Sequence, residues 1–461
     1  MNLFITAQQV KGLPPVEQTK LHELIGIYMN HATKNSVKER YYEGKIGLSE
    51  VNLGIALPKN MSDLQIGCAW GAKAVDVLAA RSMFDGFVDA GGNQSDELTN
   101  IVIDNDLITE YAKACRDELK FGCTYATLSA DPVIGCKIRF HSPLTAAAHW
   151  DGDLGRIDYG FAVISTTSTA DGKQRPTVIN LYTDDAIWVL TYVKERWIAE
   201  EHPHGMGRPL MEALRWNATS SKPFGRSRIK EPIRRLIQGY VRTMANATIG
   251  LEFATSPQKY ILGVTDDQYE QIISDKFKQY VGSIIASTTN PETGEKPTFG
   301  QLAQGTIQPH VDMMRLLATQ FSAATGLSVT DTGVVNDANP TSSEAIIAQT
   351  QTLIGMAEQL NQSNGTALKT IALMALAIAN DTTIEALGDD SKNIMAHFKN
   401  PAMPSVAATS DAAMKIASAR QAFAQTDTFL EMIGFSQADI RRIKAQERMN
   451  QGLQIVSELE E

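Results

Sequence analysis

His310-Val-Asp-Met-Met-Arg-Leu-Leu-Ala-Thr-Gln-Phe321 is the first arm of the stretch around which the chain is organised, Gln308 to Ala379, which is predicted to form a helix, a loop and a longer helix. Its hydrophobic residues recur at helical spacing, which predicts an amphipathic helix that ends at Gly326. The residues from there to Ser342 show no helical period and contain two Asp, two Asn and a Pro, which predicts an exposed, mobile loop. Thr341-Ser-Ser-Glu344 then supplies caps for a second, longer helix, with Asn364-Gly365 as a candidate break within it.

The charge of this region changes along the chain. From Leu316 to Leu368 there is no Lys or Arg, and four acidic residues give a net charge of −4. They are Asp331, Asp337, Glu344 and Glu358. Lys222 to Arg242 instead carries seven basic residues against Glu231, a net charge of +6. The acidic run does not favour binding to a polyanion, whereas the basic segment does.

Three arginines of the basic segment are seven residues apart, so we expect them on one face of a helix. They are Arg228, Arg235 and Arg242. This face either pairs with acidic residues of a neighbouring element or makes non-specific contacts with phosphates. The acidic run has a similarly plain alternative, a polar loop followed by an exposed helix. The residues alone leave both questions open.

Composition limits the classes of function. The 461 residues carry a formal net charge of −10, and 43% are hydrophobic, which is enough for a buried core in about three domains. The acidic balance argues against a protein that coats nucleic acid, so such contacts are expected to be local. The N-terminus lacks a signal-peptide pattern, and the longest apolar run, Ile371 to Ala379, is about half a membrane span. We expect a soluble protein of the cytosol or of a particle, with no membrane partner.

Motifs for catalysis and for metal binding are missing from the sequence. There is no phosphate-binding loop, nucleophile elbow or zinc spacing. His202-Pro-His204 lacks a third ligand at a suitable spacing, and Asp151-Gly-Asp-Leu-Gly155 lacks the closing glutamate of a calcium loop, so we interpret the latter as a turn. We predict no catalytic residues, no metal and no cofactor. The cysteines are expected to be reduced and mostly buried: Cys68, Cys115, Cys123 and Cys136.

The rest of the sequence predicts an α+β fold. Residues of period two predict an antiparallel sheet from Ile138 to Trp197, and the C-terminal part from Ser410 is predicted to be mostly helical. N-terminal helices are predicted at Pro14–Tyr42, Trp70–Arg81 and Asp104–Lys120. Short strands are predicted at Met83–Phe87, Gly122–Ser129 and Met395–Pro401.

Several motifs, taken in order, resemble the portal proteins, the head-to-tail connectors of tailed bacteriophages, in the branch found in long-tailed phages. Each motif is short, and their shared order carries the resemblance, which covers most of the chain. They are Arg40-Tyr-Tyr-Glu-Gly-Lys45, Trp70-Gly-Ala-Lys-Ala-Val-Asp-Val-Leu-Ala-Ala-Arg-Ser-Met-Phe-Asp-Gly-Phe87, Gly225-Arg-Ser-Arg-Ile-Lys-Glu-Pro-Ile233, Asn339-Pro-Thr-Ser-Ser-Glu-Ala-Ile346, Ser410-Asp-Ala-Ala-Met-Lys415 and Ile433-Gly-Phe-Ser436.

The resemblance implies a portal fold with a definite order of parts. A wing of helices and antiparallel sheet takes residues 1–227, followed by a first stem helix at 228–254, a small α/β clip at 255–307 and a second stem helix at 308–325. Residues 326–341 correspond to the tunnel loop, 342–400 to a long helix that returns through the wing, and 401–461 to a helical crown.

The resemblance also implies a function. In this family a ring of about twelve copies surrounds a channel at one capsid vertex, through which double-stranded DNA is packaged and later leaves. It implies a structural protein of the virion, without catalysis, assembled in the cytoplasm of the host bacterium. The implied partners are further copies of the chain, DNA without sequence specificity, the terminase large subunit, a head-tail adaptor, and major capsid and scaffolding proteins.

Candidate site residues follow by position. The tunnel-loop residues expected to face DNA are Val329, Thr330, Asp331, Thr332, Asn336, Asp337 and Asn339. The basic face of the stem is Arg228, Arg235 and Arg242, and the clip residues expected to contact terminase or adaptor are Asp266, Asp267 and Glu270. Two alternatives stay open. One is a capsid or minor head protein without a channel; the other is a metal-dependent phage DNA-processing enzyme, which would need clustered carboxylates.

Overall fold

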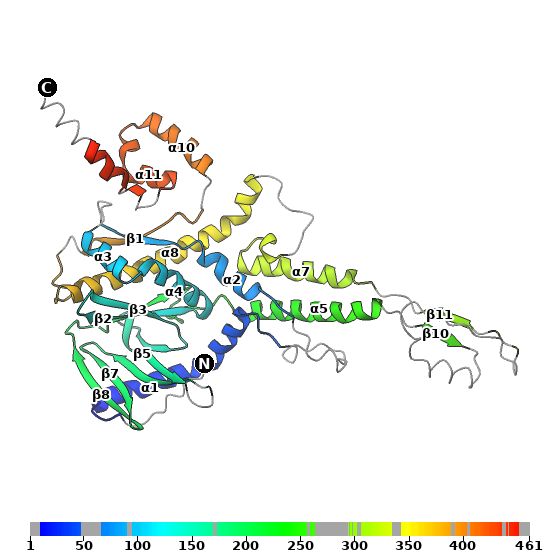
Figure 1. Ribbon diagram of the computed structural model, residues 1–461, viewed down its shortest axis with the longest axis horizontal. Helices are drawn as coiled ribbons and strands as arrows, with labels where there is room; N and C mark the ends of the chain where they lie inside the picture. Colours follow the sequence, from blue (N-terminus) through cyan, green and yellow to red (C-terminus); the bar gives the residue numbers. More distant parts are fainter. Residues whose placement is uncertain are drawn as a thin grey trace. The chain divides into compact units, whose positions relative to one another are not determined.

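Two units, each built from separate segments of the chain, make up the computed structural model of the protein (Figure 1). Unit 1 contains Met1–Glu39, Ala74–Lys230 and Ile346–Glu461, and unit 2 contains Arg40–Lys73 and Glu231–Ala345. The structure describes residues 10–47, 66–89, 95–168, 172, 174–255, 259–262, 294, 296, 298–301, 306–333, 343–388, 392–402, 406–435, 439–440 and 442–450.

A five-stranded antiparallel sheet is the largest sheet of unit 1, with the strand order β4-β5-β6-β7-β8. Each strand therefore pairs with its neighbour in sequence, as hairpin connections require. The strands are β4 (Ala146–Asp151), β5 (Arg156–Ser168), β6 (Gln174–Tyr182), β7 (Ala186–Val193) and β8 (Arg196–Pro203).

A second antiparallel sheet of unit 1 has the order β3-β2-β9. Its strands are β2 (Cys123–Asp131), β3 (Gly135–His141) and β9 (Met211–Arg215). The antiparallel prediction is confirmed, but the single sheet expected from Ile138 to Trp197 is divided, because the strand that contains Ile138 pairs with Leu128 of β2 instead of joining β4. The short strands predicted around Phe84 and Met395 pair with each other, as β1 (Phe84–Asp89) and β12 (Ile394–Phe398).

Helices cover much of unit 1. They are α1 (Pro15–Tyr42), α2 (Trp70–Ala79), α3 (Asp96–Asp104), α4 (Leu107–Phe121), α8 (Ser343–Ala379), α10 (Val406–Ala419) and α11 (Asp427–Ile433). The last residues of α1 and the first residues of α2 and α8 belong to unit 2. The helix predicted from Asp104 to Lys120 was wrong at its start. Buried Asn105 ends α3 because its side-chain amide donates to the carbonyls of Ile101 and Cys136, and Asp106 then takes a left-handed φ of 46° before α4.

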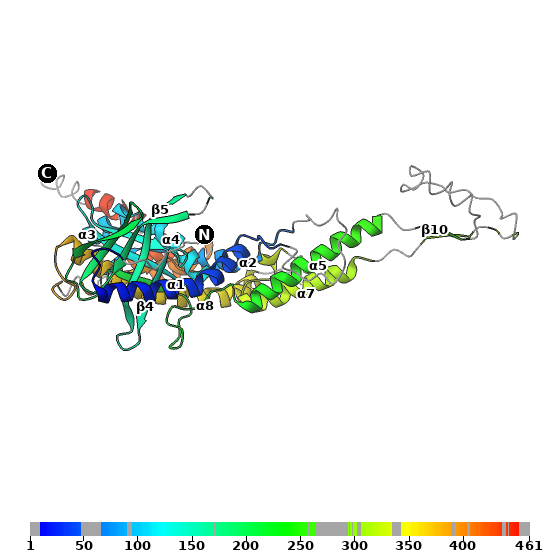
Figure 2. The ribbon, with the colours of Figure 1, turned by 90° about the horizontal axis from the view of Figure 1, so that it is seen from below.

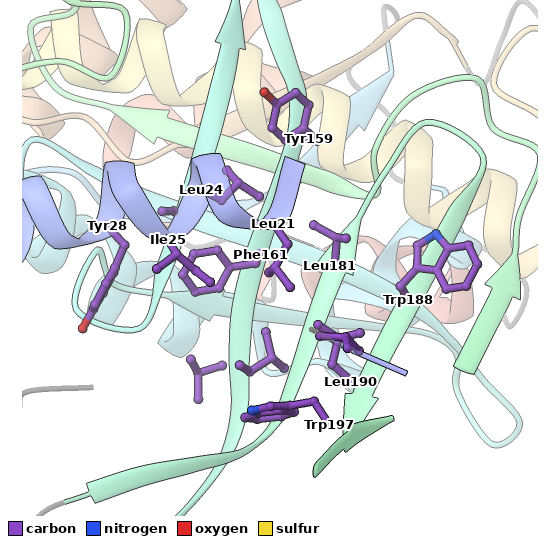
Figure 3. Packing of buried hydrophobic residues seen from close by; sticks show 14 of the residues in the cluster. Leu21, Leu24, Ile25, Tyr28, Tyr159, Phe161, Leu181, Trp188, Leu190 and Trp197 are labelled. Carbon is purple, nitrogen blue, oxygen red and sulfur yellow. The ribbon is translucent and has the colours of Figure 1, made fainter. Parts of the chain in front are cut away.

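One hydrophobic core cluster of unit 1 lies where α1 crosses the five-stranded sheet (Figure 3). The predicted stripe on α1 is buried and packs on aromatic and aliphatic side chains of β5 to β8. Its members are Leu21, Leu24, Ile25 and Tyr28, and those of the sheet include Phe161, Leu181, Trp188, Leu190 and Trp197. The rings of Tyr28 and Phe161 meet edge to face, with centroids 6.0 Å apart. Full burial of each large side chain contributes about 1.5–3 kcal/mol, so the cluster as a whole contributes strongly to holding α1 on the sheet.

The long helix α8 continues without a break through Asn364-Gly365, where a break was a candidate. Two features explain the continuity. Asn364 is fully buried and uses its side-chain amide in hydrogen bonds to other elements, so the side chain does not compete for the helix backbone. Gly365 is not among the glycines with a positive φ, so its backbone continues the helix, and it lies against Phe398, whose ring is 3.6 Å from where its Cβ would be.

A chain of buried hydrogen bonds joins α4 to α8. The Asn364 amide donates to the hydroxyl of Tyr111 at 3.0 Å and to Oε2 of Glu118 at 2.7 Å. Ser82 lies 2.6 Å from the same tyrosine oxygen and donates to Oδ1 of Asn361 at 2.6 Å. Burial without a counter-charge at hydrogen-bond distance raises the pKa of Glu118 from 4.5 to about 8. This carboxyl group is therefore mostly protonated at neutral pH.

Glu118→Gln is expected to flatten the pH dependence of stability. The folded state binds the Glu118 proton more tightly than the unfolded chain does, so the free energy of unfolding falls as pH rises between the pKa values of 4.5 and about 8. A glutamine is neutral throughout and keeps an acceptor for Asn364. Urea unfolding across this pH range measures the effect.

The matched control is Glu110→Gln on the same helix, where the carboxylate is partly exposed and pairs with Lys113 at 2.6 Å. This control should keep the fall in stability with pH that the wild type shows. An equal fall in Glu118→Gln and wild type would contradict the assignment.

Candidate functional site

Two antiparallel helices form the body of unit 2: α5 (Glu231–Thr255) and α7 (Gln308–Thr325), which lie side by side in both views (Figures 1 and 2). They approach closely at Gly239, where a Cβ would lie 3.2 Å from the Leu317 side chain. The ends of α7 follow from its sequence, with Pro309 in the first turn and Gly326 at a left-handed φ of 72° as its C-cap. The bounds of α7 coincide with the predicted 308–325 helix.

The buried indole of Trp70 lies between these two helices. Its ring is 4.7 Å from that of Phe321 on α7, nearly parallel at 28°, and 4.5 Å from that of Tyr240 on α5. The indole Nε1–H donates to the main-chain carbonyl of Thr332 at 3.1 Å. Trp70 thus contacts both helices and the turn that follows α7.

That turn is the first part of the predicted tunnel loop and forms a short 3₁₀ helix, η3 (Thr330–Thr332). The Asp331 carboxylate accepts from the amide of Ser328 at 3.1 Å and from its hydroxyl at 2.7 Å. The Thr332 hydroxyl donates to the carbonyl of Val329 at 2.6 Å, and Gly333 ends the turn with φ 76°. These local hydrogen bonds give the turn a defined conformation up to Gly333.

The seven residues predicted to face DNA therefore divide into two groups. Thr330 is exposed, Val329 and Asp331 are half-buried, and Thr332 is buried, so the expectation of an exposed loop is wrong for Thr332. Its carbonyl is occupied by Trp70 and its hydroxyl by Val329. Asn336, Asp337 and Asn339 lie outside the described residues.

The predicted basic face is also divided. Arg228 precedes α5, which begins at Glu231, so the prediction that it shares a helix face with Arg235 and Arg242 is wrong. Pro232 explains the late start, because proline is favoured in the first turn of a helix, where its missing N–H costs nothing. Arg235 and Arg242 are exposed, and Nε of Arg235 lies 2.9 Å from Oε1 of Glu231.

The Arg228 side chain is buried within unit 1, with 7% of the residue exposed. Its Nε donates to the carbonyl of Ala74, its guanidinium carbon lies 5.9 Å from the ring centroid of Trp216, and Nη1 lies 3.5 Å from the Met356 sulfur. Burial lowers the pKa of Arg228 to about 10. These contacts assign Arg228 to the packing of unit 1 and remove it from the basic surface.

The Gly225-Arg-Ser-Arg-Ile motif packs against the end of α4 in unit 1. A Cβ on Gly225, whose φ is 73°, would collide with the carbonyl oxygens of Trp216 and Gly122. The Ser227 hydroxyl donates to the carbonyl of Lys120 at 2.5 Å, and Ile229 is 1% exposed. Each named position of the motif thus has a physical requirement: no side chain, a hydroxyl and a buried apolar group.

The Arg40-Tyr-Tyr-Glu-Gly motif has a similar explanation in unit 2. Tyr41 is buried, and its hydroxyl accepts from the side-chain amide of Gln238 on α5 at 2.5 Å. A Cβ on Gly71 would collide with the carbonyl of Tyr41, and Gly44 takes a φ of 68°. The motif and the residue after Trp70 therefore form one contact with α5.

The role of Trp70 as the residue that joins α5, α7 and η3 was missed from the sequence, as were the buried Glu118 and Asn364. The partners of Trp70 on α5, α7 and η3 are more than 160 residues away along the chain, so its sequence neighbours do not indicate this role. A signal existed for Glu118, which follows Tyr111 by seven residues and Ala114 by four and so continues the buried face of α4. Its partner Asn364 on α8 is distant along the chain and could not be inferred.

The predicted clip is described only at its two ends. Strands β10 (Lys259–Leu262) and β11 (Thr298–Gln301) pair antiparallel, so the insert leaves and returns at adjacent points. Asp266, Asp267 and Glu270 lie outside the described residues, as do the helix and the strand predicted within the insert.

No cluster of three or more His, Cys, Asp or Glu residues suited to a metal ion occurs among the described residues. Asp151 forms the predicted turn, because its carboxylate accepts from the amides of Asp153 and Leu154 at 2.7 and 3.0 Å. All four cysteines are buried and unbridged, as predicted. Burial raises their pKa values, to about 11 for Cys68, so they are poor nucleophiles. Nor does any helix in the described ranges have the length and apolarity to cross a bilayer.

Gly225→Ala is expected to lower the stability of unit 1 more than Gly207→Ala does. Both glycines have a left-handed φ, 73° and 61°, so alanine costs each about 1–2 kcal/mol. Only at Gly225 does the new methyl group collide with main-chain atoms, which adds about 1–3 kcal/mol. Urea unfolding of the two variants measures the difference, and equal losses would contradict the role of close packing in this motif.

Comparison with known proteins identifies the family. The family model described as phage portal protein, SPP1 Gp6-like, matches residues 21–453. The portal protein of Mycobacterium phage D29 is 24% identical over 400 residues, covering 84% of this chain and 80% of the relative.

Two solved structures are similar at a low level. A chain in the virion of a native gene transfer agent particle has a TM-score of 0.45 and 12% identity, covering 79% of this chain and 89% of its own. A chain in the neck of the native particle, computed with C12 symmetry, has a TM-score of 0.42 and 11% identity over the same shares. The assignment rests on the family model, which confirms the resemblance found in the sequence motifs. The chain belongs to the SPP1 Gp6-like family of phage portal proteins, which are structural proteins and not enzymes.

Proposed function

We propose that this protein forms a ring of about twelve copies around a DNA channel at one vertex of the capsid. In this role it receives DNA from the terminase, joins the head to a tail adaptor and lets the genome leave, after assembly in the host cytoplasm with capsid and scaffolding proteins. The observation that carries the proposal is the order of elements in unit 2. Along the chain, α5 is followed by an insert whose ends pair as β10 and β11, then by α7, which is antiparallel to α5, and then by the turn η3. This order supports the proposed assignment of stem, clip, stem and tunnel loop.

Exposed apolar residues on the helix pair support assembly of several copies. Met313 and Leu316 of α7 are 44% and 51% exposed, and Leu251 of α5 is 47% exposed. A closed ring of identical chains buries two different surfaces of each chain against its neighbours. We assign these residues to contacts between neighbouring helix pairs, where they would leave water.

Weak contact with DNA suits a channel that must pass any sequence. Each phosphate neutralised by a Lys or Arg adds affinity, so a strongly basic channel would hold DNA in place. Of the two exposed arginines of α5, Arg235 is partly neutralised by Glu231, whereas Arg242 has no carboxylate at ion-pair distance among the described residues. We therefore propose that Arg242, rather than Arg235, contacts DNA phosphates. Asp337 would keep the loop from binding phosphate, and Asp266, Asp267 and Glu270 would contact terminase or adaptor.

The mass and shape of the purified protein test the proposal. Twelve chains of 50.3 kDa give about 600 kDa, and a central hole should admit a duplex about 20 Å wide. Light scattering and electron-microscope views along the ring axis measure both. A closed shell would instead support a capsid protein, and metal-dependent cleavage of plasmid DNA would support an enzyme.

The double variant Met313→Glu with Leu316→Glu should abolish the ring and leave folded single chains, because two charges then enter the proposed contact. Val133→Glu, at an 87% exposed position in the β2–β3 turn, is the control and should leave the ring intact. A ring of normal mass in the double variant would remove these residues from the contact.

Asp337→Lys is expected to slow DNA packaging several-fold at low salt and less at higher salt, because a new lysine adds salt-dependent affinity for phosphate. Asp337 is a better target than Asp331, whose carboxylate holds the η3 turn. Asp153→Lys makes the same charge change on the exposed β4–β5 turn and serves as the control. Packaging assays in assembled particles measure the rates. Equal rates for Asp337→Lys and wild type at low salt would exclude a role for loop charge.

A further inference from the structure

The turn after α7 is tied to the rest of unit 2 at both of its ends. At the start, the hydroxyl of Ser322 on α7 donates to the carbonyl of Leu327 at 2.6 Å. At the end, the indole of Trp70 donates to the carbonyl of Thr332 at 3.1 Å. Between these two points the turn is held by its own bonds, chiefly those between Ser328 and Asp331. The turn therefore has its own internal hydrogen bonds and is attached to the rest of unit 2 at two points.

The hydrogen bond between Trp70 and Thr332 is buried, so its loss would cost more free energy than the loss of an ordinary surface hydrogen bond. Trp70 is 3% exposed and Thr332 is 9% exposed, so solvent has little access to replace either partner. An indole N–H has one hydrogen to donate and accepts nothing, so loss of the Thr332 carbonyl would leave a buried donor unsatisfied. The position of that carbonyl is thus strongly determined by the position of the indole.

The position of the indole is in turn determined by both helices. Tyr240 of α5 and Phe321 of α7 lie at 4.5 and 4.7 Å from the Trp70 ring, each within the range of favourable aromatic contacts. Movement of one helix along the other would break one of these ring contacts or carry the indole with it. The same ring therefore contacts both helices and holds the end of the turn.

We propose that Trp70 is a positioning residue for the turn from Leu327 to Gly333: by holding the Thr332 carbonyl while it packs on both α5 and α7, the indole fixes the place of this turn on the helix pair. The consequence for DNA rests on the proposed function, because it requires the loop to contact DNA. The hydrogen bond between Trp70 and Thr332 belongs to the folded chain and can be tested without DNA.

Trp70→Phe tests the attachment, since phenylalanine keeps an aromatic ring between Tyr240 and Phe321 but has no N–H. Hydrogen exchange measured by mass spectrometry on the full-length protein should show the amides of Asp331, Thr332 and Gly333 exchanging up to about tenfold faster than in the wild type. Amides in the middle of α5 and α7 should keep their rates. Unchanged exchange in the turn, or equal acceleration in both helices, would overturn the proposal.

Further variants separate the hydrogen bond from the packing. Replacement of Trp70 by 3-benzothienylalanine keeps the two-ring shape and removes only the N–H, so it should reproduce the faster exchange even if the smaller phenylalanine disturbs folding. Tyr240→Phe keeps both the stack and the indole N–H, and Tyr28→Phe removes a hydroxyl that donates to the Leu144 carbonyl in unit 1. Neither should change exchange in the turn, and an effect equal to that of Trp70→Phe would overturn the proposal.

Packaging assays with the same variants distinguish this inference from the proposed function. Faster exchange with slower packaging supports both. Faster exchange with normal packaging supports the attachment and contradicts a role of the loop in DNA passage. Unchanged exchange overturns the attachment, whatever the packaging rate.

Discussion

The described part of unit 2 depends on the burial of one indole ring. Trp70 fills the space between α5 and α7, and its two faces and its single polar atom are all used, by Tyr240, Phe321 and the Thr332 carbonyl. Gly71 directly after it has no side chain, so the carbonyl of Tyr41 can approach. A pair of helices in water is only marginally stable by its own propensity, so a shared aromatic core of this kind is what makes the pair a defined structure.

Local patterns in the sequence predicted most of the elements. The apolar stripe of α1 and the strands of the sheet could be predicted because the spacing of apolar residues along a helix or strand indicates which side faces the core. The end of α7 followed from Gly326, and the caps before Glu344 placed the start of α8 correctly to within two residues. Family motifs then ordered these elements, and the family itself is now established.

Predictions that depended on contacts between distant segments were less reliable. Arg228 has the spacing of an exposed helix residue, yet it is buried because Ala74, Trp216 and Met356 surround it. Asn105 was predicted to lie within a helix, but its side-chain amide donates to the carbonyl of Cys136, and the residue forms the C-cap of α3. Thr332 belongs to a stretch with loop composition and is buried by Trp70. Ala74 and Met356 for Arg228, Cys136 for Asn105 and Trp70 for Thr332 all lie more than thirty residues away along the chain, so the sequence around each changed residue does not reveal them.

Burial of the Glu118 carboxyl group couples folding to the uptake of a proton at this residue. The unfolded chain carries this group ionised at neutral pH, and the folded chain, with a pKa of about 8, carries it mostly protonated. Each chain that folds therefore takes up most of one proton from its surroundings at this residue. The formal net charge of −10, which counts Glu118 as ionised, is then closer to −9 for the folded chain. If about twelve chains assemble into one ring, the difference amounts to roughly a dozen charges per particle, enough to alter its electrophoretic mobility.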